Sequence, residues 1–312
     1  NLLEKEGLID RNGYFDSTGG RKAQAIQIVS DFRISIGIGI LKNMFHITAI
    51  DLYGNAFYTE TIALPYSNTE DYYRQLTDKV REFIAENHYP EEKILGVSIA
   101  TQGITSPDNS TVIYGNIMNN TGMKLEDFSR HLPYPCHLEH DSKSAAFLEL
   151  WNHPELDSAV VFLLNRNLGG AIITNHQIHQ GSSMHSGTLE HMCVNPDGPL
   201  CYCGNRGCLE TYVSATGIKR TVFELMARET VPSVLRDVPY DKFDARIITE
   251  AAQKGDSLAL EVFRCTAERL GRALANAVAI TSPEAVFFFG GLAQAGELLL
   301  EPTRRYLEEN LL

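Results

Sequence analysis

The segment of residues 191–210 combines one histidine, four cysteines and three glycines, and reads HMCVNPDGPLCYCGNRGCLE. Thiolate sulfur and imidazole nitrogen are ligands with which Zn²⁺ forms closed tetrahedral sites. Gly204 and Gly207 allow the tight backbone turns that direct several sulfurs to one point. The alternative is that these cysteines are reduced and pack in a core, where free cysteine is common. Three cysteines within eight residues, interrupted by glycines, form a poor core pattern, so the segment predicts a structural zinc site.

The predicted site has four ligands, which are His191, Cys201, Cys203 and Cys208. Cys193 lies in the same segment and is the one alternative ligand. We prefer His191 because it completes a set of three thiolates and one imidazole, which is a common composition of structural zinc sites.

The composition is that of a globular protein. The chain has 312 residues, enough for about two domains, and 44% of them are hydrophobic. No apolar run approaches the ~18 residues of a membrane span, and no signal peptide pattern opens the chain. Clustered cysteines suit a reducing compartment, so we predict a cytoplasmic protein. The net charge of −12 argues against nonspecific DNA affinity of the body, so DNA binding would need a locally basic attachment.

The first thirty residues have the pattern of such an attachment. Residues 2–9 indicate the end of a short helix closed by Gly7, and a turn sequence follows at residues 10–13. The sequence STGGR and an extended stretch at residues 26–29 then predict a β-ribbon with Arg21 and Lys22 near its tip. A basic ribbon of this kind is suited to contact DNA phosphates. The alternative is a disordered leader before the first domain.

Beyond residue 30 the chain alternates between strand and helix patterns. Strands are expected at residues 34–40, 45–51, 56–62, 93–100, 159–164, 171–174 and 285–289. Helices are expected at residues 71–87 and 258–280, because their apolar side chains recur at helical spacing. The two halves repeat one order, β-β-β-α-β. We therefore expect residues 1–30 to be the ribbon and linker, 31–136 a small α/β domain, and 137–312 a large α/β domain with the zinc loop.

The zinc segment, together with Ser214 and Gly217 beyond it, resembles the signature of the ROK family of repressors, unassigned reading frames and sugar kinases. The resemblance extends from about residue 2 to residue 312, and the sequences GLI and STGGR are similar to the end of the winged helix-turn-helix in ROK repressors. It implies an α/β fold of the actin-like ATPase (ribonuclease H-like) class, with two domains and a partial N-terminal winged helix. It also implies that about two helices of this winged helix, and a final helical stretch after Leu312, lie outside the sequence.

The kinases of this family hold ATP phosphates through two glycine turns, which read D-x-G-G-T and G-T-G-I-G. The matching positions here are Gly39-Ile40-Leu41-Lys42-Asn43 and Asn165-Arg166-Asn167-Leu168-Gly169. The acid is absent and most glycines are replaced by residues whose side chains obstruct backbone contact with phosphate. Gly290-Gly291 is retained, but a glycine pair at a strand end is weak evidence. Kinase chemistry needs positioned phosphates, so we predict that the protein is not an enzyme.

The resemblance also implies a sugar site. Asp141 stands where the kinases place the general base, and His140 replaces the customary asparagine. The family motif G-E-x-G-H is changed, since Thr188 takes the glutamate position and Glu190 the glycine position. The remaining positions implied to contact the ligand are Asn116, His191 and Glu210. Alternatively, Asp141 is a helix N-cap and His140 a surface residue, which would leave the site defunct.

These observations predict a transcriptional repressor of carbohydrate metabolism whose body responds to a sugar or sugar phosphate. His191 could link the two roles, because one ring nitrogen can bind the metal while the other meets a hydroxyl. Operator DNA would be bound by a homodimer or higher homo-oligomer. Two alternatives remain, which are an ATP-dependent hexose kinase and a DNA-binding relative that has lost its effector site.

Overall fold

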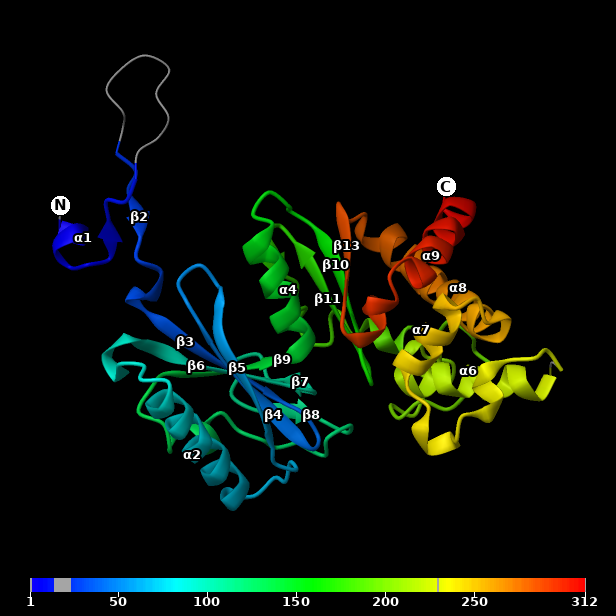
Figure 1. Cartoon of the computed structure of the whole chain (residues 1–312), viewed down its shortest axis with the longest axis horizontal. Helices are drawn as coiled ribbons and strands as arrows, with labels where there is room; N and C mark the ends of the chain where they lie inside the picture. The colour runs from blue at the N-terminus through cyan, green and yellow to red at the C-terminus, as the bar shows by residue number, and fades with distance from the viewer. Residues whose placement is uncertain (1, 14–23, 229, 312) are drawn as a thin grey trace, which may run out of the picture. The chain divides into compact units, whose positions relative to one another are not determined.

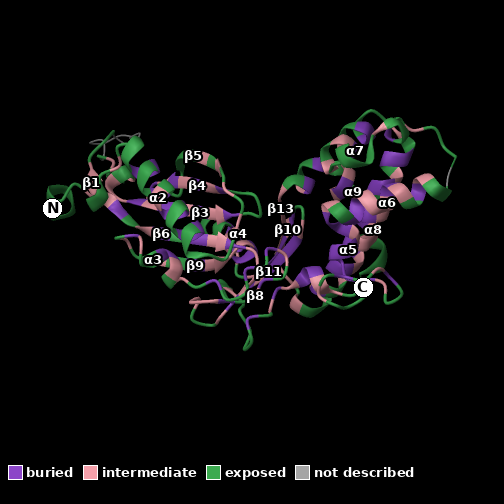
Figure 2. Cartoon of the chain, turned by 90° about the horizontal axis from the view of Figure 1, so that it is seen from below, coloured by how far each residue is buried: buried purple, intermediate pink, exposed green. Residues whose placement is uncertain are grey.

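The computed structural model describes residues 2–13, 24–228 and 230–311, and shows an α/β protein (Figure 1). The chain forms two compact units, Asn1–Asp141 and Ser142–Leu312. The division follows residue 141 and not residue 136, because residues 137–140 belong to a strand of the first unit's sheet. Figure 2 shows that buried residues concentrate on the strands and on the inner faces of the helices within each unit.

The N-terminal segment forms a short helix and a two-stranded ribbon. Helix α1 (Leu2–Lys5) ends before Gly7, whose φ of 78° is the left-handed conformation that commonly ends helices. Strand β1 (Ile9–Asp10) pairs antiparallel with β2 (Gln27–Ile28), and the 3-10 helix η1 (Ser30–Phe32) leads into the first unit. The predicted basic tip of this ribbon, with Arg21 and Lys22, lies outside the described residues.

A five-stranded sheet forms the centre of the first unit. Its order is β5 (Ala56–Ala63), β4 (Met44–Ile50), β3 (Ile34–Ile40), β6 (Ile94–Thr101) and β9 (Cys136–His140). The pairs β5–β4 and β4–β3 are antiparallel, whereas β3–β6 and β6–β9 are parallel. Parallel neighbours bring the carboxyl ends of β3, β6 and β9 to one edge of the sheet, where His140 ends β9.

One face of this sheet packs against helix α2 (Glu70–Glu86). Every second residue of β3 is buried, as expected for a strand with one face on a core. The helix contributes Leu76, Val80 and Phe83 to the same core. It begins after Thr69, whose hydroxyl accepts a hydrogen bond from the Tyr72 backbone N–H.

Shorter elements complete the first unit. They are η2 (Glu91–Lys93), β7 (Ile104–Thr105), β8 (Val112–Tyr114) and α3 (Glu126–Ser129). Strands β7 and β8 form an antiparallel pair. The buried Asn120 amide donates to the Thr101 hydroxyl over 3.1 Å and to the Gln102 carbonyl over 2.7 Å. It thereby fixes the chain where β6 ends.

The second unit has a four-stranded sheet with helices on both faces. The order is β12 (Gln177–Ile178), β11 (Leu168–Thr174), β10 (Ala159–Leu164) and β13 (Ala285–Phe289), and β10–β13 is the parallel pair. Ala146 of helix α4 (Asp141–Asn152) packs with Val161 on one face. Phe162 and Leu164 point to the other face and join the largest core cluster. Strand β10 is therefore buried on both sides, which explains its continuous apolar sequence.

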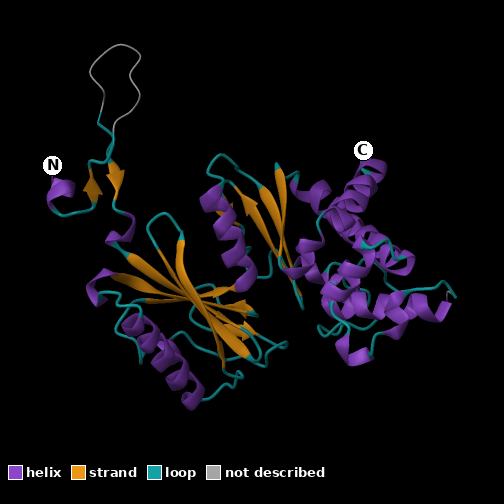
Figure 3. Cartoon of the chain, in the orientation of Figure 1, coloured by secondary structure: helices purple, strands orange, loops and turns teal. Residues whose placement is uncertain are grey.

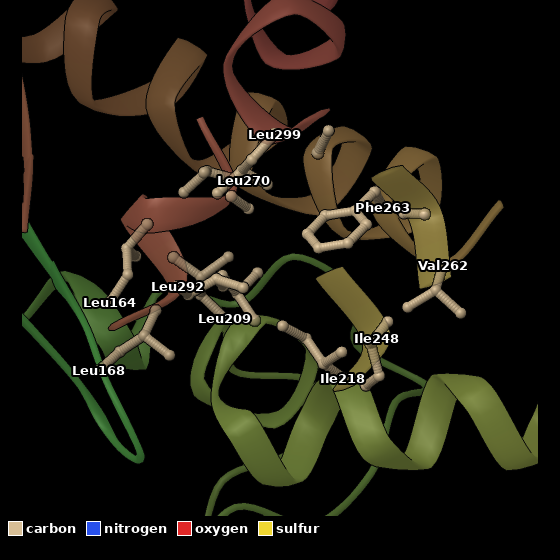
Figure 4. Close-up of a cluster of buried hydrophobic side chains, with 14 of the residues drawn as sticks. Leu164, Leu168, Leu209, Ile218, Ile248, Val262, Phe263, Leu270, Leu292 and Leu299 are labelled. Atoms are coloured by element: carbon tan, nitrogen blue, oxygen red, sulfur yellow. The ribbon is translucent and has the colours of Figure 1, made fainter. Parts of the chain in front are cut away.

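Helices predominate in the rest of the second unit (Figure 3). They are η3 (Leu189–His191), α5 (Glu210–Val213), α6 (Ala215–Arg228), η4 (Val234–Asp237), η5 (Tyr240–Lys242), α7 (Ala245–Gln253), α8 (Ser257–Thr281), η6 (Gly291–Ala295) and α9 (Glu297–Asn310). Side chains of α6, α7 and α8, including Ile218, Ile248 and Phe263, meet Leu209 and Leu292 in one core (Figure 4). Leu209 is next to Cys208 in the segment of residues 191–210, which we call the metal loop. This core therefore anchors the metal loop.

The strands and helices predicted from periodicity are present. The predicted strand at 159–164 is β10, and the predicted helices at 71–87 and 258–280 are α2 and α8, with ends that differ by one residue. Strand β11 begins three residues before its predicted start, because residues 168–170 pair with β10. No helix within the described ranges combines the length and apolar composition needed to cross a membrane.

Candidate functional site

The four predicted metal ligands gather at one point of the second unit. One ligand atom from each of His191, Cys201, Cys203 and Cys208 lies within 4.8 Å of all the others. Cys201 Sγ is 3.7 Å from His191 Nδ1, and Cys203 Sγ is 3.7 Å from Cys208 Sγ. A zinc tetrahedron with sulfur bonds of ~2.3 Å has sulfur–sulfur edges of ~3.8 Å. The donor set and its spacing therefore fit a tetrahedral metal ion.

The local backbone explains how four residues from one loop converge. His191 ends the 3-10 helix η3, and Cys208 lies just before α5. Between them a tight turn closes where Gly204 N–H donates to the Cys201 carbonyl over 3.0 Å. Gly207 has a φ of 67°, and a Cβ there would lie 1.5 Å from the Asn195 carbonyl oxygen. Only glycine fits at position 207 without displacing this backbone.

Burial and hydrogen bonding together shift the pKa values of the four ligands. Burial raises the pKa of the Cys201 and Cys208 thiols, and both residues are almost completely buried. For Cys203 burial also raises the pKa, but hydrogen bonds from the Asn205 backbone and from the neighbouring thiols outweigh it and lower the pKa overall. Burial lowers the pKa of His191, which favours the neutral imidazole that a metal requires.

Cys193, the alternative ligand, lies outside this group. Its side chain is exposed, and its thiol donates to the Arg206 carbonyl over 3.6 Å. His191 is instead the fourth member, with Nδ1 directed at the sulfur of Cys201 and Nε2 lying 4.0 Å from Glu190 Oε1. The side chain of Glu190 is buried. The nitrogen of His191 that does not face the thiols therefore faces a carboxylate.

Glu210 joins the metal loop to the turn between β10 and β11. Its Oε2 accepts from the Leu168 backbone N–H over 2.7 Å, and its Oε1 accepts from the Asn167 amide over 2.9 Å. Burial raises the pKa of this carboxyl, although hydrogen bonds from Leu168, Asn167 and Ser214 act in the opposite direction. Glu210, which the resemblance implies as a sugar contact, thus also holds the turn of residues 165–169, which matches the second glycine turn of the kinases.

The turn of residues 165–169 is tied to the glycine pair at the end of β13. Gly291 N–H donates over 2.9 Å to the side-chain carbonyl of Asn165. Gly290 has a φ of 92°, and a Cβ there would lie 2.5 Å from the Leu164 carbonyl oxygen. An amide that could face a phosphate is therefore occupied by a side chain of the protein itself. Sequence reasoning missed this role of Asn165, because 126 positions separate it from Gly291.

The turn at residues 41–43 connects β3 and β4 as a tight hairpin. Leu41 N–H donates to the Met44 carbonyl over 2.9 Å, which closes the turn. Leu41, Lys42 and Asn43 are exposed and carry side chains where the kinase pattern has two glycines and a threonine. The backbone here pairs with itself as an ordinary β-turn.

Three of the residues predicted to contact a sugar lie in the first unit. His140 ends β9, and its Nε2 is 3.5 Å from Asp141 Oδ1. Asp141 is the first residue of α4, and its side chain is 25% exposed. Asn116 is exposed, and its amide donates to the Tyr114 hydroxyl over 2.9 Å. His140 and Asp141 thus form a polar pair at the carboxyl edge of the sheet.

The other four candidates lie in the second unit beside the metal loop. Thr188 precedes η3, and its hydroxyl donates to the His185 carbonyl over 2.9 Å. Glu190 and His191 follow within η3, and Glu210 begins α5. These positions cluster because Leu209 N–H donates to the Met192 carbonyl, which pairs the two ends of the metal loop.

Comparison with known proteins extends these observations. The sequence pattern of the ROK family matches residues 33–312. The N-acetylglucosamine repressor of Escherichia coli O157:H7 is 29% identical over 304 residues, which are 96% of this chain and 73% of that protein. The glucokinase of Thermotoga maritima is 30% identical over 244 residues, which are 75% of this chain and 74% of that protein. A crystal structure of a ROK family transcriptional regulator, a homolog of the E. coli MLC protein, matches 99% of this chain and 78% of its own with a TM-score of 0.83 and 23% identity.

The two α/β units and this structural likeness define a protein with the actin-like ATPase fold. More particularly, the chain belongs to the ROK family. The actin-like fold class and the family predicted from the sequence are confirmed, whereas the partial N-terminal winged helix stays a prediction.

The glycines of the metal loop provide a matched test of its geometry. Gly204 and Gly207 both have positive φ, but a Cβ at position 204 meets nothing within 4 Å. Gly204→Ala should therefore cost only the strain of a left-handed alanine, about 1–2 kcal/mol. Gly207→Ala should cost this strain and about 1–3 kcal/mol more, because it displaces the Asn195 backbone. Urea unfolding followed by circular dichroism measures both, and equal destabilisation by the two variants would contradict the loop geometry.

Proposed function

We propose that this protein is a transcriptional regulator, a repressor of carbohydrate metabolism, that responds to a sugar and has lost kinase activity. The observation that carries the proposal is the segment before residue 33, where the family pattern begins. The repressor relative matches almost the whole chain, whereas the glucokinase relative matches three quarters of it at similar identity. Identity alone does not separate the two activities, and the extra N-terminal segment favours the regulator.

The structure of that segment supports a wing that contacts DNA. A helix end, a left-handed glycine and an antiparallel ribbon follow one another at α1, Gly7 and β1–β2. This is the order in a winged helix-turn-helix, in which a ribbon follows the recognition helix. We assign Arg21 and Lys22, which lie between β1 and β2 in the sequence, to phosphate contacts. The proposed partner is operator DNA bound by a homodimer or higher homo-oligomer. A small DNA-binding domain gains affinity when two copies bind two half-sites.

The glycine turns support the loss of kinase activity. Asn165 accepts the N–H of Gly291, and Glu210 accepts two N–H groups from the turn of residues 167–168. The turn of residues 41–43 is a closed hairpin with three side chains. Phosphoryl transfer depends on backbone donors and Mg²⁺ that position the phosphates, and these donors are already used. A sugar kinase is the alternative that this geometry opposes.

We assign the metal as a structural Zn²⁺ held by His191, Cys201, Cys203 and Cys208. Three thiolates and one imidazole leave no open position for a substrate, so the ion would stabilise the loop and take no part in chemistry. Because Cys208 lies two residues before Glu210, the ion would also fix the start of α5 and the carboxylate that holds residues 167–168. The metal would therefore stabilise the part of the second unit that contains Glu210 and residues 167–168.

The effector is proposed to be a sugar or sugar phosphate. The candidate contacts are Asn116, His140 and Asp141 in the first unit, and Thr188, Glu190, His191 and Glu210 in the second, each group taken by itself. Without a nucleotide, Asp141 would accept a hydrogen bond from a hydroxyl and would abstract no proton. His191 belongs to both the metal set and the proposed sugar set, so ligand contact at its Nε2 would act on the metal loop. This is a direct physical route from effector to loop.

The metal assignment has a direct test. The purified protein should contain one zinc per chain by elemental analysis, and Cys203→Ser should lose the metal and much of the stability of the loop. Structural zinc contributes on the order of 10 kcal/mol in small domains, and less here because a large core already exists. Cys265→Ser is the matched control, because Cys265 lies on α8 outside the ligand group and its loss should leave the zinc in place. Unchelated protein without zinc would refute the assignment.

The regulator assignment is tested on DNA with a chain that carries the complete winged helix. Binding to a palindromic operator should be weakened by a sugar from a panel of hexoses, amino sugars, pentoses and their phosphates. Arg21→Ala should weaken binding about equally across operator variants and lower the salt slope by roughly one unit, because a phosphate contact carries no base information. Fluorescence anisotropy at several salt concentrations measures both effects.

The control is Arg246→Ala, a highly exposed arginine on α7 that should leave operator affinity unchanged. Full affinity of the Arg21→Ala variant at every salt concentration would contradict the wing. An operator complex that no sugar weakens would instead favour a relative that has lost its effector site.

A further inference from the structure

Cys193 lies directly opposite the metal ligand Cys208 in a short antiparallel pairing of the loop's two ends. The two residues form a single bridge. Val194 N–H donates to the Gly207 carbonyl over 2.9 Å, and Leu209 N–H donates to the Met192 carbonyl over 2.9 Å. These two bonds join the neighbours of Cys193 and Cys208 and not the two cysteines themselves. Cys193 and Cys208 therefore occupy a non-hydrogen-bonded position of the antiparallel pairing. In such pairs the Cα atoms are about 4.5 Å apart and the side chains share one face.

This spacing falls within the range that a disulfide requires. Bonded cysteines have Cα atoms about 4.4–6.8 Å apart, so the pair is near the short limit. The two thiols also differ in access. Cys208 is completely buried in the metal group, whereas Cys193 is exposed and outside it. An oxidant in solution therefore reaches Cys193 first.

We propose that Cys193 is an oxidation site for peroxide, and that its disulfide with Cys208 releases the metal from the loop. The proposal rests on the metal assignment made above. Cys193 is exposed and is not one of the four metal ligands, and this proposal assigns it a function. The metal loop would then respond to oxidants as well as stabilise the fold.

The chemistry uses two thiols and one hydrogen peroxide. The thiolate of Cys193 attacks one peroxide oxygen, the O–O bond breaks, and hydroxide leaves and takes a proton to become water. The sulfur of Cys193 is now a sulfenic acid. The thiolate of Cys208 then attacks this sulfur, the S–O bond breaks, a second hydroxide leaves as water, and the S–S bond forms. Two electrons pass from the thiols to the peroxide, and the metal loses one of its four ligands.

Loss of Cys208 as a ligand would act on its neighbours. The remaining set of His191, Cys201 and Cys203 is an open three-ligand site, which holds zinc less tightly than a closed one. Glu210, two residues further on, holds the turn of residues 167–168. A thiolate of a small reductant can attack this disulfide and regenerate both thiols, so the change would be reversible.

The test compares three zinc-loaded proteins, the wild type, Cys193→Ser and the control Cys265→Ser, during treatment with hydrogen peroxide. A chromogenic chelator measures zinc release. We expect Cys193→Ser to release zinc about tenfold more slowly than the other two, because it lacks the exposed thiol. Dithiothreitol should restore zinc binding in the wild type. Equal release rates in all three proteins would overturn the proposal.

Digestion of the oxidised protein identifies the bond. Trypsin with endoproteinase Asp-N separates Cys193 on residues 167–196 from Cys201 and Cys203 on residues 197–206 and Cys208 on residues 207–219. A linked pair of the first and third fragments by non-reducing mass spectrometry is the expected product. A link from Cys208 to residues 197–206 alone would overturn the proposal, since Cys203 is also close to Cys208.

The same digestion separates this proposal from the metal assignment. If the protein contains no zinc as purified, the metal assignment fails and so does metal release. The cross-link between Cys193 and Cys208 would still form in that case if the cysteine pair reacts as proposed, and its absence would refute the pair itself.

Discussion

The buried carboxylate of Glu210 connects the parts of the second unit on which the functional account depends. One oxygen accepts the Leu168 backbone N–H and the other accepts the Asn167 amide, while Cys208 lies two residues before it in the metal group. The same turn reaches Gly291 through Asn165. Removing the carboxylate would leave a buried backbone donor without its partner, which costs about 1–3 kcal/mol. Metal loop, turn and glycine pair therefore form one connected structure.

On the proposal that kinase activity is lost, this connection explains how the body would keep its fold without that chemistry. The N–H of Leu41 is bound by the Met44 carbonyl, that of Leu168 by Glu210, and that of Gly291 by Asn165. The largest core, which packs β10 against α8, does not depend on those donors. The actin-like fold thus persists, and the proposed regulator uses the polar residues near the metal loop to sense a ligand. The N-terminal ribbon precedes residue 33, where the family pattern begins, and is the feature on which the proposed DNA-binding role rests.

Much of this could be predicted from local sequence, and the reasons are physical. His191, Cys201, Cys203 and Cys208 are close in the chain, so spacing and ligand type together predicted this group, with Cys193 as the alternative that the structure places outside it. Helix α2 was predictable because burial of one face imposes the helical period on its sequence. Strand β10 was predictable because burial of both faces makes its sequence continuously apolar. The bond from Asn165 to Gly291 was not, because it joins distant positions through one polar contact. Strand β9 was missed because its sequence, CHLEH, is short and largely polar. Because β9 belongs to the sheet of the first unit, the boundary between the units follows residue 141 and not residue 136.

The central claim is that the protein keeps the kinase fold without phosphoryl transfer. The most direct measurement is transfer of the γ-phosphoryl group from radiolabelled ATP to a panel of hexoses and amino sugars in the presence of Mg²⁺. The account predicts no labelled sugar above the protein-free background, because the N–H groups of residues 168 and 291 are already bound within the protein. Sugar-dependent formation of ADP and of a labelled sugar phosphate by the unmodified protein would contradict it.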